Sequence, residues 1–104
     1  SYVSSTEHIV AWHAHEIQTD YWLCLKGRFK VGWATEEDGC EWKYLSDKNQ
    51  KVLEIPPGTF HGYQALEPNS ILLYYVTKAY DAKKPDEIRK PIGYFNEIWK
   101  VPNK

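Results

Sequence analysis

The chain has 104 residues, of which 13 are basic and 14 acidic, giving a formal net charge of −1. This length fits a single domain, and the lack of a basic stripe argues against binding to a nucleic-acid backbone. No apolar run reaches the roughly 18 residues of a membrane span and no signal-peptide core opens the chain, so we expect a cytoplasmic protein. Cys24 and Cys40 lack metal-ligand spacing and sit in apolar or aromatic patterns, which predicts two buried free thiols.

Short strand-like runs alternate with turn residues along most of the chain. We expect strands near residues 8–12, 21–25, 29–34, 40–45, 52–55, 60–66 and 71–77. Phe29, Val31 and Trp33 alternate with polar or small residues, a period of two that indicates a β-strand. Gly39 and the segment Pro56-Pro57-Gly58 mark turns. Close-set short strands without a helical period predict an all-β sandwich or barrel.

The sequence changes character after residue 77, where it becomes polar and contains prolines. We expect one helical turn after Pro85 and a last extended segment over residues 98–101. The chain is therefore predicted to form one domain over residues 1–104. Residues 1–77 would supply the barrel strands, and residues 78–104 a C-terminal loop and packing segment.

Three of the four histidines stand at informative positions. His13 and His15 are two residues apart, so on a strand they point to the same face. Asp20 and then Gly27 follow them, and His61 comes shortly after Pro56-Pro57-Gly58. This arrangement resembles the two cupin motifs, which are His-x-His, an acid and Gly in the first, and Pro-x-Gly-x-x-His in the second. The resemblance implies a cupin-type jelly-roll β-barrel (a double-stranded β-helix) with an irregular C-terminal tail and the three histidines inside one mouth.

The histidine cluster is compatible with two chemistries. Imidazoles and a carboxylate that converge from different strands can hold a divalent metal ion, and the candidate ligands are His13, His15, Asp20 and His61. An imidazole without metal is a suitable general base near neutral pH. The remaining interpretation is that these histidines are hydrogen-bonded core or rim residues without a chemical role.

Motifs in the second half of the chain indicate which cupin family the sequence resembles. The segment Ile55-Pro56-Pro57-Gly58-Thr59-Phe60-His61-Gly62-Tyr63, and the run Leu72–Thr77 after it, resemble the dTDP-4-dehydrorhamnose 3,5-epimerases. The loop that follows this strand in the family is resembled by three segments here, Tyr80-Asp81, Pro85-Asp86-Glu87 and Arg89-Lys90-Pro91. Ile98-Trp99 resembles the family's late tryptophan. The segment Val10–His15 is similar to the related sugar-nucleotide 3,4-ketoisomerases.

The resemblance implies proton removal beside the carbonyl of a dTDP-4-keto-6-deoxy sugar, without a cofactor. His13 would be the catalytic base and Tyr74 the acid on the opposite ring face. His15, His61, Tyr63, Trp22 and Arg28 would bind the substrate. Val10 stands where the family has an arginine before the base, and Asp20 aligns near its enolate-binding lysine. The family's aspartate that orients the base aligns beyond Lys104.

Three functions remain open from the sequence. The first is a sugar-nucleotide epimerase or ketoisomerase, and the second is a metal-dependent cupin enzyme. The third is a non-catalytic carbohydrate-binding cupin, which the 15% aromatic content would suit. In each case the partner is a small sugar or sugar nucleotide, and exposed strand edges in a small barrel also predict a homodimer.

Overall fold

The computed structural model describes residues 2–3, 5–77 and 86–99. These residues form nine strands and no helix. The strands are β1 (Tyr2–Val3), β2 (Ile9–His15), β3 (Asp20–Lys26), β4 (Arg28–Thr35), β5 (Gly39–Ser46), β6 (Leu53–Ile55), β7 (Phe60–Ala65), β8 (Ser70–Val76) and β9 (Glu87–Arg89). The described part of the chain accordingly contains no helix able to cross a membrane.

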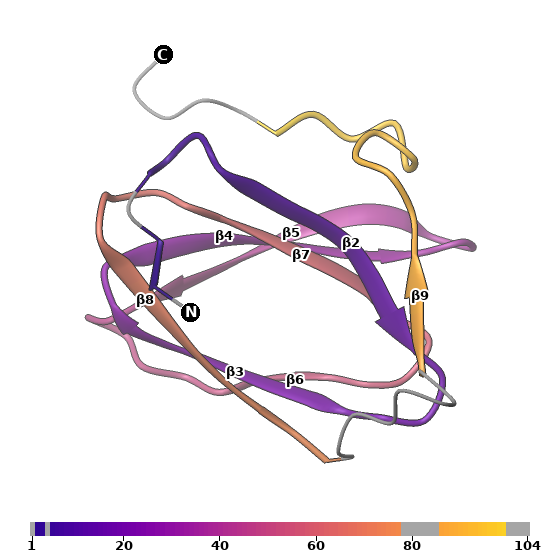
Figure 1. Ribbon diagram of the computed structural model, residues 1–104, viewed down its shortest axis with the longest axis horizontal. Coiled ribbons are helices and arrows are strands. Elements are labelled where there is room, and N and C mark those ends of the chain that lie inside the picture. The colour runs from indigo at the N-terminus through magenta and orange to yellow at the C-terminus, as the bar shows by residue number, and fades with distance from the viewer. Residues whose placement is uncertain (1, 4, 78–85, 100–104) are drawn as a thin grey trace.

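The strands form two antiparallel sheets that face each other, as Figure 1 shows. One sheet has the order β1-β8-β3-β6 and the other the order β5-β4-β7-β2-β9. Chain neighbours such as β2 and β3 lie in opposite sheets, which is the jelly-roll arrangement predicted from the sequence. The all-β prediction is therefore confirmed.

All seven strands expected from the sequence are present, with ends shifted by at most a few residues. β1 and β9 were not expected. The helical turn predicted after Pro85 is wrong for the described residues 86–89, because Glu87–Arg89 extend and pair with β2. Two parts of the sequence-based expectations lie outside the described residues. They are residues 82–85, before the expected turn, and residues 100–101 of the expected last segment.

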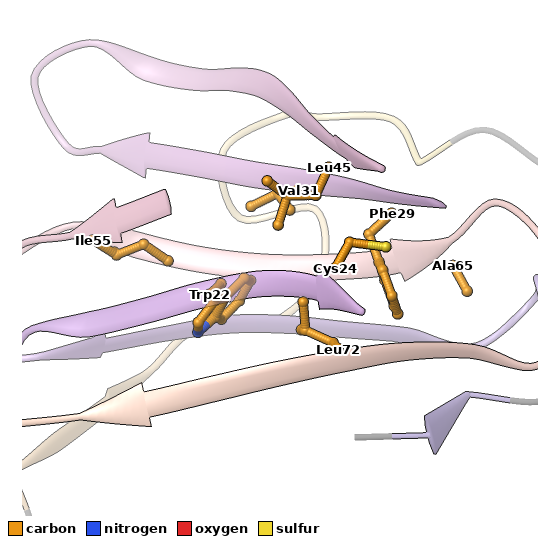
Figure 2. Close-up of a cluster of buried hydrophobic side chains, with 8 residues drawn as sticks. All are labelled: Trp22, Cys24, Phe29, Val31, Leu45, Ile55, Ala65 and Leu72. Carbon is orange, nitrogen blue, oxygen red and sulfur yellow. The ribbon is translucent and has the colours of Figure 1, made fainter. Parts of the chain in front are cut away.

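The main core fills the space between the two sheets (Figure 2). β3, β8 and β6 contribute Trp22, Cys24, Leu72 and Ile55, and the other sheet contributes Phe29, Val31, Leu45 and Ala65. Each of these side chains is buried. Removing such side chains from water supplies most of the folding free energy, about 1.5–3 kcal/mol for each large one.

The outer face of the five-stranded sheet is also covered. Trp12, Ala14, Ala34 and Phe60 form a second cluster there, and Phe95 and Trp99 of the C-terminal segment pack onto it. Gly32 provides the space, because a Cβ at this position would lie 2.4 Å from the Trp12 ring. The two thiols are free, but only Cys24 is buried; Cys40 is half-buried beside this cluster, so the prediction was wrong for it.

Candidate functional site

β2 and β7 bring the three motif histidines to the inner face at one end of the sandwich. His13 lies directly opposite His61 in the β2–β7 ladder, and the rings of His15 and His61 stack with centroids 5.5 Å apart. The alternation of side chains along β2 places His13 and His15 on one face. The structure thus gathers the predicted histidines in one place.

His61 is the most deeply buried of the three, at 5% exposure. Burial lowers its pKa to about 4, so the ring is neutral at physiological pH. Its Nδ1 lies 3.2 Å from the carbonyl oxygen of Thr59, and a neutral ring donates the Nδ1 proton there. The unprotonated Nε2 then faces Asp20 Oδ2 at 3.4 Å, while the Trp22 ring packs edge-on against the imidazole.

Asp20 and His15 complete a group of converging polar atoms. Asp20 is buried, receives a hydrogen bond from Gln18 Nε2, and its Oδ1 lies 3.9 Å from His15 Nε2. One ligand atom each from His15, Asp20 and His61 lies within 4.8 Å of the others. A carboxylate facing an unprotonated imidazole nitrogen suits either a hydroxyl donor or a divalent cation.

His13 is hydrogen-bonded to a carboxylate from the C-terminal segment. β9 pairs with β2 so that Glu87 lies opposite His15, and Glu87 Oε2 accepts a hydrogen bond from Nδ1 of His13. Arg89 Nε donates to the same carboxylate at 3.2 Å. Burial acts to raise the Glu87 pKa, but the hydrogen bonds from His13 and Arg89 outweigh it and leave the pKa below its ordinary value.

This contact fixes the chemistry available to His13. Because Nδ1 carries the proton given to Glu87, the neutral ring keeps a lone pair on Nε2. A carboxylate in this position both orients the imidazole and stabilises the imidazolium formed when the ring takes a second proton. This arrangement would allow His13 to act as an oriented general base.

Asp86 precedes β9 and is hydrogen-bonded to the turn between β2 and β3. Its carboxylate accepts hydrogen bonds from the backbone N–H groups of Glu16, Ile17 and Gln18, at 2.8–3.1 Å. Desolvation opposes ionisation, but these N–H groups outweigh it and lower the Asp86 pKa. The turn, Glu87 and the two histidines of β2 are therefore joined in one hydrogen-bonded unit.

The remaining residues predicted for the site differ in how closely they approach the histidines. Trp22 and Tyr63 meet edge-on, with ring centroids 5.6 Å apart, and Trp22 also packs edge-on against His61. Tyr74 lies opposite Trp22 in the β3–β8 ladder and so shares its inward side, whereas Tyr75 pairs with Tyr21 on the other side. Tyr74 is 55% exposed.

Arg28 is not brought to the histidines. It begins β4, whose Trp33 is the residue that pairs with His61, and its Nε binds Glu67 Oε2 at 2.8 Å. Five residues of extended strand separate Arg28 from Trp33, about 16 Å.

Sequence reasoning missed Glu87. In the sequence, Glu87 stands in a segment that resembles the family but is given no role there, whereas in the structure its carboxylate on β9 accepts the hydrogen bond from His13. The alternation of Glu87 and Arg89 around Ile88 is a strand signal, but three residues are too few for a period to be recognised.

The two facing antiparallel sheets and the histidine-lined end of the sandwich are those of a cupin-type jelly roll. A family model described as dTDP-4-dehydrorhamnose 3,5-epimerase matches residues 36–92. The chain belongs to this family, as its sequence motifs predicted.

Two curated relatives and a solved structure illustrate the relationship. The protein named "Probable low-salt glycan biosynthesis epimerase Agl13", from Haloferax volcanii, is 40% identical over 78% of this chain and 57% of its own length. The "Spore coat polysaccharide biosynthesis protein SpsL" of Bacillus subtilis is 33% identical over 80% of this chain and 60% of its own. The chain therefore spans less than two thirds of either relative.

A variant of the 3,4-ketoisomerase QdtA from Thermoanaerobacterium thermosaccharolyticum, solved in complex with TDP-4-keto-6-deoxyglucose, has the same fold. It superposes with a TM-score of 0.75 at 20% identity, covering 86% of this chain and 62% of that one.

Proposed function

We propose that this domain acts on a dTDP-4-keto-6-deoxy sugar as an epimerase or ketoisomerase, by removing a proton from a carbon beside the carbonyl. The observation that carries the proposal is the hydrogen bond from His13 Nδ1 to Glu87, which leaves Nε2 of His13 as an oriented base. Family membership supports the reaction class, and QdtA, named as a ketoisomerase, was solved with such a sugar nucleotide.

In the proposed first step, the C–H bond beside the carbonyl breaks and its proton goes to Nε2 of His13. The electron pair moves to the carbonyl oxygen and gives an enolate, while Glu87 stabilises the imidazolium. For epimerisation, the enolate carbon takes the hydroxyl proton of Tyr74 from the opposite ring face and the carbonyl re-forms. Water then reprotonates the phenolate, and the imidazolium of His13 releases its proton to solvent. His61 Nε2 and Asp20 would accept a hydroxyl proton of the sugar, and Trp22 and Tyr63 would line the pocket.

The reaction is tested by incubating the domain with the keto sugar nucleotide in D₂O and following the ring protons by NMR. Deuterium entering beside the carbonyl supports enolate formation. A complex that forms without any exchange favours the carbohydrate-binding alternative instead.

A metal-dependent cupin is the second candidate, and one observation favours it: His15, Asp20 and His61 present ligand atoms within 4.8 Å of one another. The neutral ring of His61 is in the protonation state that metal ligation needs. His13 is not in this group: the ligand atoms that come together within this distance are those of His15, Asp20 and His61. Elemental analysis of purified protein separates the candidates, since the proposed reaction proceeds without stoichiometric metal.

We further propose that the domain forms a homodimer through the outer face of β3 and β8. Leu73 and Tyr75 are 54% and 68% exposed there, and they pair with Leu23 and Tyr21. These two pairs are uncharged, and together they form an exposed patch that a second copy could cover. Light scattering at tens of micromolar should give a dimer mass, and Leu73→Glu should halve it. A monomeric wild-type chain contradicts this proposal.

A cytoplasmic location agrees with a sugar-nucleotide substrate and with the free thiols of Cys24 and Cys40.

A further inference from the structure

Residues 91–99, the C-terminal segment after β9, lie along β2 on the outer side of the five-stranded sheet, away from the main core (Figure 1). They form turns and no strand, so no ladder of backbone hydrogen bonds holds them to the sheet. Within the segment, the N–H of Tyr94 donates to the carbonyl of Pro91 at 3.1 Å, and the N–H of Asn96 donates to that of Gly93 at 2.9 Å. The position of the segment on the sheet therefore depends mainly on its side chains.

The carboxylate of Glu97 joins the turns of this segment. Its Oε2 accepts hydrogen bonds from the backbone N–H of Gly93 at 2.6 Å and from the indole Nε1 of Trp99 at 3.0 Å. Its Oε1 accepts one from the backbone N–H of Phe95 at 3.1 Å. Desolvation opposes ionisation of Glu97, but the donors directed at it, led by the N–H of Gly93, outweigh that effect and lower its pKa. One ionised side chain thus ties the segment together.

The rings of Phe95 and Trp99 attach the segment to β2 by packing against Trp12. The centroid of the Trp12 ring lies 5.1 Å from that of Phe95 and 5.7 Å from that of Trp99, and Trp12 is fully buried. Glu97 binds the backbone of Phe95 and the side chain of Trp99, so it sets the position of both rings. Burial of these rings is what keeps the segment against β2.

Trp12 also fixes the end of β9. The backbone groups of Trp12 and Lys90 exchange two hydrogen bonds, at 3.0 and 3.1 Å. Trp12 precedes His13 and Lys90 follows β9, so these bonds continue the pairing of the two strands. Glu87 reaches His13 in this register, and a slip of one residue would turn its side chain to the other face of the sheet. The contact that orients the base therefore depends on how firmly Lys90 is held at Trp12.

β9 is short, and each of its ends has its own anchor. The strand has 3 residues and forms an edge of the five-stranded sheet, so its own ladder supplies few hydrogen bonds. Before the strand, Asp86 is hydrogen-bonded to the turn between β2 and β3. After it, the pairing of Lys90 with Trp12 and the packed C-terminal segment hold the chain.

We propose that Glu97 is a positioning residue for the proposed base, His13. It keeps residues 91–99 folded over Trp12, and β9 thereby stays in the register that places Glu87 against the base. This inference rests on the proposed function for the role of His13. It goes beyond that function because it gives a part in the reaction to a carboxylate on the outer face of the sheet, which no motif in the sequence includes. Without this carboxylate, the donors of the segment lose their acceptor and β9 is held at its start only.

The direct test reads the tautomer of the His13 ring and needs no substrate. In wild type, Glu87 holds the ring proton on Nδ1 of His13, and the carbonyl of Thr59 does the same for His61. In Glu97→Ala, the proton of His13 should distribute over both ring nitrogens, whereas His61 should keep its Nδ1 proton. Ring nitrogen chemical shifts measured by NMR at about pH 8, well above the ordinary histidine pKa, distinguish the tautomers.

Two further variants make this measurement specific. Glu36→Gln is the matched control, because Glu36 also contacts the segment, through the exposed hydroxyl of Tyr94 at 3.0 Å, but binds none of its backbone N–H groups. It should leave both tautomers as in wild type. Glu97→Gln should give an intermediate result, since its amide offers one acceptor oxygen where the carboxylate offers two. Circular dichroism checks that each variant folds.

A double-mutant cycle on deuterium exchange tests whether Glu97 acts through Glu87. Glu97→Ala alone should slow exchange several-fold. In a Glu87→Ala background no carboxylate is left to be positioned, so adding Glu97→Ala should cause little further loss. Losses that multiply fully in the double variant would contradict the positioning role.

The outcomes separate this inference from the proposed reaction. A change of the His13 tautomer in Glu97→Ala with an unchanged His61 supports the positioning role. That result without deuterium exchange in wild type would contradict the reaction alone. An unchanged His13 tautomer contradicts the role of Glu97. A change at both rings also contradicts it, because Glu97 would then stabilise the sandwich as a whole.

Discussion

Glu87 accepts a hydrogen bond from Nδ1 of His13, although the two residues are 74 positions apart in the chain. The carboxylate comes from β9 and the imidazole from β2, and the pairing of those strands sets their register. The C-terminal segment thus contributes a side-chain contact to the histidine cluster in addition to covering the sandwich.

The first prediction concerns this carboxylate. Glu87→Gln keeps the side chain's size but removes the charge that stabilises an imidazolium, so deuterium exchange should slow by about tenfold or more. The acid limb of the pH–rate profile should also move to lower pH, which a purely structural change would not cause. Glu54→Gln, an exposed residue of β6, is the matched control and should exchange like wild type. An unchanged pH–rate profile in Glu87→Gln contradicts the role.

The second prediction concerns Tyr74, the proposed proton donor. Tyr74 shares the inward side of β8 with the site, and Tyr75 faces the other side. Tyr74→Phe should retain deuterium exchange but lose inversion, since the first proton transfer does not need the second group. Tyr75→Phe should retain both. Loss of inversion in Tyr75→Phe instead would show that the acid is assigned to the wrong tyrosine.

The third prediction is a pH dependence of stability. The His61 pKa is about 4 in the folded protein and about 6.5 in the unfolded chain. Between these values the unfolded chain takes up a proton that the folded protein does not, so the free energy of unfolding falls as the pH falls. From pH 7 to pH 5 this group should cost about 2 kcal/mol.

Urea unfolding at pH 7, 6 and 5 measures this dependence, above the range where the lowered pKa values of Asp86, Glu87 and Glu97 come into play. His61→Asn should lose most of the slope, whereas the exposed His8→Asn should keep it. Equal slopes in wild type and His61→Asn would contradict the buried neutral histidine.

The fourth prediction concerns the packing that supports His61. A Cβ at Gly62 would lie 2.6 Å from both the Ala11 Cβ and the Val10 carbonyl oxygen. Gly62→Ala should therefore lower the free energy of unfolding by about 1–3 kcal/mol, measured by urea denaturation. Gly39→Asn is the control, because Gly39 has open space and a φ of +74° that asparagine tolerates. Equal stability of the two variants would mean that β2 and β7 separate easily.

The strands between residues 9 and 76 were predictable because period-two patterns and strong turn residues such as Gly58 mark them locally. The shared face of His13 and His15 was predictable because residues two apart on a strand point the same way, and the resemblance to the cupin motifs added His61. Pairing between distant strands leaves no such local signal. The contact of Glu87 with His13 and the position of Trp33 beside His61 follow from register, which only the folded sheet defines.

Solvent deuterium exchange in His13→Asn tests the central claim most directly, because exchange needs only enolate formation and not a particular product. Wild type should incorporate deuterium beside the carbonyl of a dTDP-4-keto-6-deoxy sugar, in the presence of a chelator. His13→Asn should reduce incorporation to the rate of the uncatalysed reaction, while His8→Asn should match wild type. Exchange that survives in His13→Asn, or that stops when the chelator is added, would contradict His13 as the metal-free base.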